Sequence, residues 1–122
     1  MPRFALLEHT GAPDDPTGRH IDLLVEDGDQ CRTWRLADLP HAGGPAVTAV
    51  EIAPHRLAWL DHLDGPVSDG RGHARLIDSG TCRMVTHQGD AVIEIGSGAT
   101  AVFLRFRDGM CAATREQPER PF

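Results

Sequence analysis

No long apolar run occurs in the 122-residue sequence, and this absence excludes a transmembrane helix, which needs about 20 consecutive apolar residues. The opening stretch, MPRFALLEHTGAPDDP, also lacks the apolar segment and the small-residue cleavage pattern of a signal peptide. We therefore expect a cytoplasmic protein with no membrane partner.

Cysteine is scarce. The three cysteines, Cys31, Cys82 and Cys111, are an odd number and show no C-x-x-C spacing. This argues against a disulfide framework and against a cysteine-rich zinc site. We expect three reduced thiols that pack as small apolar side chains in strands.

Positive charge is outnumbered, because 12 Lys and Arg residues face 18 Asp and Glu residues and the formal net charge is −6. This balance disfavours a broad surface that coats nucleic acid. A small site that grips one phosphate stays possible, and Arg56, Arg71 and Arg75 form a local basic group.

The common catalytic and phosphate-binding motifs are missing as well. The sequence contains no G-x-S-x-G, P-loop, H-E-x-x-H or dinucleotide fingerprint. The glycine-rich GSGAT at residues 96–100 joins two expected strands without a following helix, so we expect no phosphate cradle there.

Glycine (13 residues) and proline (9 residues), by contrast, punctuate the whole chain. The connectors EDGDQ, DSG, QGD, GSG and RDG have the composition of tight turns. Between the connectors, short strands are predicted at residues 3–9, 20–26, 31–36, 47–52, 74–78, 81–87, 91–95, 100–106 and 110–115. Short strands with such frequent turns indicate an all-β barrel or sandwich.

A single helix of about two turns is predicted over residues 54–63, PHRLAWLDHL, with Leu57 and Leu60 on one side. The length suits one domain, residues 1–122, in which residues 116–122 are expected to form a loose tail.

The stretch HIDLLVE, residues 20–26, suggests a candidate site. Successive side chains of a strand point to opposite faces, so His20, Asp22 and Leu24 share one face. That face is either exposed to solvent or part of a metal or phosphate site. If the strand before it pairs with this one, His9 completes a set of two histidines and one carboxylate, which leaves coordination positions open.

His55 and Arg56 stand at the start of the predicted helix. They form either an exposed cap or a grip for an anion at the helix N-terminus. The other histidines, His41, His62, His73 and His87, are expected to be surface or structural residues, and Trp34 and Trp59 are expected to be packing residues.

The order of these segments resembles the 3′-phosphoesterase family, which comprises the N-terminal module of bacterial DNA ligase D and its stand-alone relatives. RFALLEH is similar to the family's first strand, which ends in histidine, and HIDLLVE is similar to its H-Y-D-F-R-L-E strand. CRTWRL, IAPHRLAW and LDGPVSDGRGHARLIDSGTC are similar to the motifs that follow, so the resemblance extends over residues 3–115.

This resemblance implies a compact β-barrel of about eight strands with one or two short helices, and a manganese-dependent phosphoesterase. The enzyme would remove 3′-phosphates and terminal ribonucleotides from nucleic-acid 3′ ends, beside a separate ligase or polymerase of end repair. His9, His20 and Asp22 would hold the metal, and His55 would contact the phosphate as the catalytic residue. Zinc, iron(II) or nickel would also suit these donors.

Several positions depart from the family pattern. Leu24 stands where the family has an arginine, Trp59 where it has a tyrosine, and Ala53 where it has an acid. The segment between His9 and His20 is also longer, because TGAPDDPTGR is inserted.

The arginine matters most, since a guanidinium binds phosphate through two hydrogen bonds and leucine cannot. Arg19, Arg56 or Arg71 could supply the charge from another direction. The alternative is a catalytically reduced, metal-containing barrel that binds nucleic-acid ends or a repair partner. A third possibility is an unrelated small barrel, in which the three predicted metal ligands would lie far apart.

Overall fold

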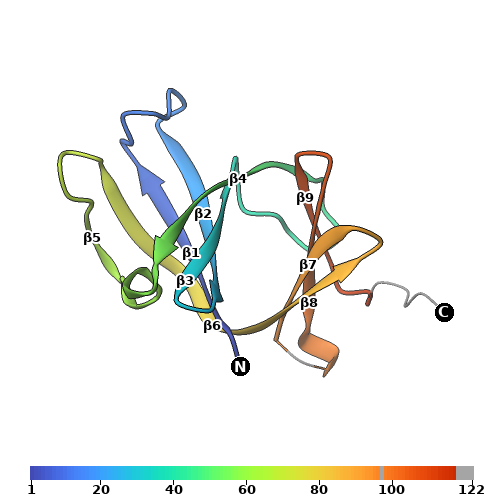
Figure 1. Ribbon diagram of the computed structural model, residues 1–122. Helices are drawn as coiled ribbons and strands as arrows, with labels where there is room; N and C mark the ends of the chain where they lie inside the picture. The colour runs from blue at the N-terminus through green and yellow to red at the C-terminus, as the bar shows by residue number, and fades with distance from the viewer. Residues whose placement is uncertain (97, 118–122) are drawn as a thin grey trace.

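The computed structural model describes residues 1–96 and 98–117 and is all-β, as predicted (Figure 1). The elements of this part of the chain are β1 (Arg3–Thr10), β2 (Arg19–Asp27), β3 (Gln30–Leu36), β4 (Val47–Arg56), the 3₁₀ helix η1 (Leu57–Asp61), β5 (Asp64–Pro66), β6 (His73–His87), β7 (Asp90–Ile95), the 3₁₀ helix η2 (Gly98–Thr100), β8 (Val102–Arg107) and β9 (Met110–Thr114). None of the helices within the described residues has the length and apolar character that a membrane crossing requires.

Eight of the strands close into a ring in the order β1-β2-β3-β4-β9-β8-β7-β6, because β6 also pairs with β1. Every pairing between these strands is antiparallel. The shortest pairing joins β4 to β9 at Val47–Cys111 and Thr48–Met110, and β5 extends the sheet beyond β6. The prediction of about eight strands is therefore confirmed.

The prediction of two strands at residues 74–78 and 81–87, separated by a DSG turn, was wrong. Both segments belong to the single strand β6, which runs from the side of β1 to the side of β7 (Figure 1). Asp78, Ser79 and Gly80 pair regularly with β1, and a bulge lies just before them at Ile77, since Leu6 pairs with Asp78 but Leu7 pairs with Leu76. A bulge bends a strand without ending it, which lets β6 take part in both halves of the ring.

The predicted helix at residues 54–63 is shorter than expected. Residues 54–56 end β4, and only Leu57–Asp61 are helical. His55 and Arg56 pair with Cys31 and Gln30 of β3, so their backbone groups belong to the sheet. His55 therefore extends from the end of a strand, and Arg56 is the N-cap of η1.

Two predicted segments, the GSG turn and the C-terminal tail, lie partly outside the described residues. The GSG segment was predicted as a tight turn, but Gly98 begins η2, and residue 97 lies outside the described residues. Most of the predicted tail, residues 118–122, also lies outside the described residues.

The main core fills the inside of the ring and receives side chains from all eight of its strands. Trp34 stacks on Phe106 with ring centroids 4.6 Å apart, which links β3 to β8 across the core. The residues of this core are Phe4, Leu6, Ile21, Leu23, Val25, Trp34, Leu36, Ala49, Cys82, Ile93, Leu104, Phe106, Cys111 and Ala113. The alternating pattern of residues 20–26 is thus confirmed on its apolar face.

The opposite face of β2 is buried too, which excludes the solvent-face interpretation. Leu24 has no exposed surface and packs outside the ring with Leu7, Cys31 and Leu60. Because Leu60 belongs to η1, the short helix covers this second cluster. Next to Leu24 on the same face, His20 and Asp22 are also buried, so two ionisable groups lie in the sheet away from water.

The three cysteines are buried and free, as predicted. They lie on β3, β6 and β9 and contribute to the two apolar clusters. Burial raises the pKa of the Cys82 thiol to about 11 and that of Cys111 to about 12. Both groups therefore stay protonated at neutral pH and act as apolar packing residues.

Gly72 allows the loop between β5 and β6 to lie directly against the end of β1. It has a φ of +91°, and a Cβ at this position would overlap the carbonyl oxygen of Thr10. Its own carbonyl accepts a hydrogen bond of 2.8 Å from the Val67 N–H, which closes the loop. Gly70, two residues earlier, has a φ of +67° but open space where a Cβ would lie.

We expect Gly72→Ala to lower the free energy of unfolding by about 3 kcal/mol, from backbone strain and overlap together. Gly70→Ala, the matched control, should cost about 1 kcal/mol because only the left-handed conformation is penalised. Urea denaturation of both variants measures the difference. Equal losses would show that the contact between the loop and β1 contributes nothing.

Candidate metal centre

The structure brings together the three residues that the sequence analysis predicted as metal ligands. β1 and β2 pair so that His9 lies opposite His20, and Asp22 follows two residues along β2. One ligand atom from each residue lies within 4.8 Å of the others. The Asp22 carboxylate is 3.5 Å from His9 Nδ1 and 3.3 Å from His20 Nε2. This group could hold a metal ion.

Two atoms of this group are buried without a hydrogen-bond partner among the described residues. They are His20 Nε2 and Asp22 Oδ1, and the 3.3 Å between them does not form a hydrogen bond. Leaving a buried polar atom unpaired costs about 1–3 kcal/mol. A cation between the two would satisfy both, which fits the donor chemistry of a divalent metal.

The second nitrogen of each imidazole is held by an acceptor. His9 Nε2 donates to the carbonyl oxygen of Arg71 at 2.7 Å, and His20 Nδ1 donates to the Asp15 carboxylate at 2.7 Å. Since these acceptors require the proton on those nitrogens, the neutral tautomers leave His9 Nδ1 and His20 Nε2 free as ligands. Outer partners of this kind orient metal-binding histidines.

Asp15 is a residue of the candidate site that the sequence analysis missed. Its side chain is only 8% exposed, although it lies in the loop between β1 and β2. Hydrogen bonds from Thr17 and then from His20 lower the pKa of Asp15 to about 2. The sequence D-P-T-G, typical of a turn closed by an aspartate side chain, was the signal that could have identified it.

The protonation of His20 reflects two opposing effects. Burial lowers its pKa most strongly, but the Asp22 carboxylate 3.3 Å away and the hydrogen bond to Asp15 together outweigh burial, so the pKa is raised. A metal ion at Nε2 would have to displace a proton from the imidazolium form.

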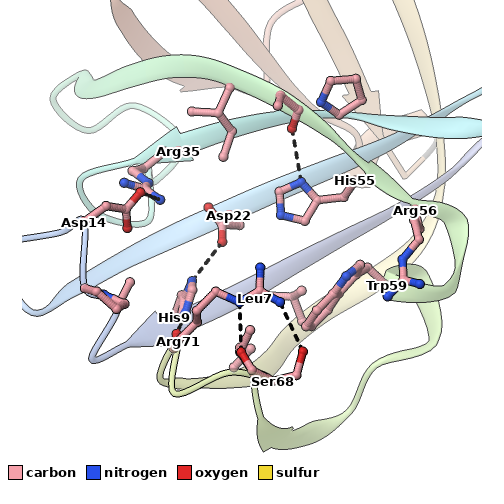
Figure 2. A pocket seen from close by; sticks show the side chains of 17 residues that line it. Leu7, His9, Asp14, Asp22, Arg35, His55, Arg56, Trp59, Ser68 and Arg71 are labelled. Atoms are coloured by element: carbon pink, nitrogen blue, oxygen red, sulfur yellow. Dashed lines mark hydrogen bonds and ion pairs between the residues drawn. The ribbon is translucent and has the colours of Figure 1, made fainter.

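A pocket of about 560 Å³ opens above the group, with His9 and Asp22 in its wall. Figure 2 shows Asp22 near the middle of this pocket, with side chains from several elements around it. The cationic and aromatic side chains that line it are Arg35, His55, Arg56, Trp59 and Arg71. Figure 2 places Arg35 and His55 on opposite sides of Asp22.

The structure places His55, Arg56 and Arg71 in this pocket, as their predicted roles require. His55 Nδ1 donates to the Ala53 carbonyl at 3.3 Å, and its ring lies 6.2 Å from that of Trp59. The Arg71 guanidinium donates to the backbone and hydroxyl oxygens of Ser68. Within the described residues, neither Arg56 nor Arg71 forms an ion pair with a carboxylate, so no carboxylate neutralises the charge of these two pocket residues.

Arg19 is not part of the pocket lining. It donates to Glu8 at 2.7 Å and to Asp38 at 3.3 Å. Hydrogen bonds from Arg19 and Arg75 in turn lower the pKa of the Glu8 carboxyl. The predicted phosphate-binding role of Arg19 therefore has no support from its position, because its charge is already balanced.

Arg35 lines the pocket although the sequence analysis did not select it. It lies on β3 directly opposite Asp22 of β2. The signal was present in CRTWRL, because Trp34 and Leu36 face the core and the alternation places Arg35 on the other face, with Asp22.

If Asp15 orients His20, the Asp15→Ala variant should bind Mn²⁺ about 10- to 100-fold more weakly than the wild type. Asp29→Ala removes the same charge from the exposed turn between β2 and β3 and should leave the affinity unchanged. The Mn²⁺ affinity of the wild type and of each variant is measured by Mn²⁺ titration with detection by electron paramagnetic resonance. Wild-type affinity in Asp15→Ala would contradict the orienting role.

Comparisons with known proteins add no name to this site. No protein-family model matches the chain, and no curated protein matches its sequence.

Proposed function

We propose that the protein is a metal-dependent phosphoesterase that acts on 3′ ends of DNA or RNA in end repair. The observation that carries this proposal is the convergence of His9, His20 and Asp22, with two buried ligand atoms unpaired, below a pocket lined by arginines. The resemblance to the 3′-phosphoesterase family supplies the reaction and the substrate class.

The donor set suits a divalent ion. Two neutral imidazole nitrogens and one carboxylate leave coordination positions open for water and substrate. When bound, the ion would supply Lewis acidity that polarises a phosphoryl oxygen and lowers the pKa of a water molecule. Manganese is the metal we expect, and zinc, iron(II) and nickel are accepted by the same donors, because affinity alone does not select manganese.

His55 is the group in the pocket that can move a proton. Its Nδ1–H is committed to the Ala53 carbonyl, so Nε2 is the nitrogen that can accept a proton or, in the imidazolium form, donate one. Donation to the leaving 3′ oxygen would assist departure of the phosphate.

The arginines of the pocket balance the charge of a phosphate. Arg71 has a double role, since its carbonyl holds His9 while its guanidinium lines the pocket. A guanidinium recognises phosphate by charge-assisted hydrogen bonds. The net charge of −6 opposes broad coverage of a duplex, which agrees with recognition of a chain end in one small pocket.

The burial of Leu24 favours a second candidate function. This residue stands where the resembling family has an arginine, yet it has no exposed surface and packs against Leu7 and Leu60. The second candidate is a domain that keeps the metal and binds nucleic-acid ends or a repair partner without efficient turnover.

The test is hydrolysis of a 3′-phosphorylated primer–template by the wild type with Mn²⁺. We expect His20→Ala and Asp22→Ala to lose at least about 100-fold of the activity, and His55→Ala to lose about 100- to 10,000-fold, because it removes the proton donor. The control is His41→Ala, an exposed histidine outside the pocket, which should keep full activity.

Equal activity in the wild type and in both metal-ligand variants would refute the phosphoesterase. Fluorescence anisotropy with a labelled 3′ end distinguishes the two candidates. Tight binding of the end without hydrolysis would support the second candidate, whereas hydrolysis by the unaltered protein would end it.

A further inference from the structure

Arg35 of β3 faces the metal group from the neighbouring strand and was not among the arginines considered from the sequence. It pairs directly with Asp22 in the register of β2 and β3, and both side chains lie on the face that the pocket covers. Thr33, the next residue of β3 on this face, pairs with Leu24 and has no exposed surface. A guanidinium at the position of Arg35 therefore adjoins the metal group where the face opens into the pocket.

The hydrogen-bonding capacity of Arg35 is largely unused. Its Nε is buried and has no hydrogen-bond partner within the described residues. In the part of the chain that the structure describes, its one ion pair joins Nη2 to Asp14 at 3.3 Å, and the Asp14 side chain is 72% exposed. A guanidinium offers five N–H donors in a planar fork, so a single long contact to a solvated carboxylate leaves most of them available.

The positive charge of Arg35, beside the metal group, favours the binding of an anion between the two. A metal ion beside Asp22 and the guanidinium of Arg35 would repel each other across the strand pair. An anion that contacts both would replace this repulsion by two attractions. Asp14 supplies only a weak counter-charge from the solvent side, because an exposed ion pair contributes little.

We propose that Arg35 is the residue that binds the phosphate group beside the metal, with its guanidinium donating from β3. It would bind the phosphate in place of the arginine that the resembling family has at the position of Leu24. The inference rests on the proposed metal centre and narrows its ligand to an oxyanion that bridges the metal and a guanidinium. Because Arg35 and His55 lie on opposite sides of Asp22 (Figure 2), a phosphate between them would meet the guanidinium on one side and the imidazole on the other.

The loop between β1 and β2 would then control both partners of the phosphate. Asp15 holds His20 of the metal group, and the adjacent Asp14 contacts Arg35. A bound phosphate competes with the Asp14 carboxylate for the same guanidinium. Removal of that carboxylate should therefore strengthen phosphate binding.

The experiment is a calorimetric titration of the Mn²⁺-loaded protein with inorganic phosphate. We expect Arg35→Gln to weaken phosphate binding about 10- to 100-fold, since a hydrogen-bonded charge partner is lost. Arg35→Lys keeps the charge but not the planar fork and should be intermediate. Asp14→Asn should bind phosphate more tightly than the wild type. Arg83→Gln, at an exposed arginine paired with Glu94, is the matched control and should bind normally.

A separate readout excludes a merely structural role. Mn²⁺ affinity without phosphate, measured by electron paramagnetic resonance, should be unchanged or higher in Arg35→Gln, because a neighbouring positive charge is removed. Normal phosphate binding by Arg35→Gln would overturn the proposal, and so would a wild type that binds no phosphate. Loss of Mn²⁺ binding in Arg35→Gln or Arg35→Lys would overturn it as well.

The failure of this inference and the failure of the proposed function give different results. Phosphate binding that depends on Arg35, in a protein that does not hydrolyse a 3′-phosphorylated end, leaves the inference standing and removes the phosphoesterase. Hydrolysis of the 3′-phosphorylated end, with phosphate binding that is unchanged in Arg35→Gln, supports the phosphoesterase and refutes the role of Arg35.

Discussion

The burial of the Asp22 carboxylate is the constraint on which the site depends. A carboxylate removed from water costs several kcal/mol unless partners compensate for it. The antiparallel register of β1 and β2 supplies these partners, because it places one imidazole 3.5 Å and another 3.3 Å from the same carboxylate. A slip of one residue would turn these side chains to the other face, where the apolar core lies.

The strands supply the ligands, but two loops fix their chemistry. The Arg71 carbonyl, in the loop after β5, sets the tautomer of His9, and Asp15, in the loop after β1, sets that of His20. Gly72 lets the first loop approach β1 closely enough for the contact with His9. The regular sheet therefore makes the group of three possible, and the irregular segments make two nitrogens available for a metal.

Much of this arrangement follows from local patterns, and the exceptions have physical causes. Alternation placed His20 and Asp22 on one face, and Arg35 follows by counting from the short turn at Gly28, since Asp27 pairs with Gln30 and Asp22 with Arg35. Asp15 could not be found in this way, because a loop has no register. The continuity of β6 could not be predicted either, since Asp78, Ser79 and Gly80 have the composition of a turn and only their pairing with β1 makes them part of a strand.

Leu24 of β2 and Arg35 of β3 have different roles on the same face of the sheet. Leu24 packs with Leu7 and Leu60 and so seals the sheet beneath η1, where a guanidinium would need its own partners. One strand away, Arg35 keeps a positive charge beside Asp22 while most of its donors stay free for a ligand. Arg56 and Arg71 line the same pocket. With leucine at position 24 of β2, the arginines that line the pocket come from β3, from the end of β4 and from the loop after β5.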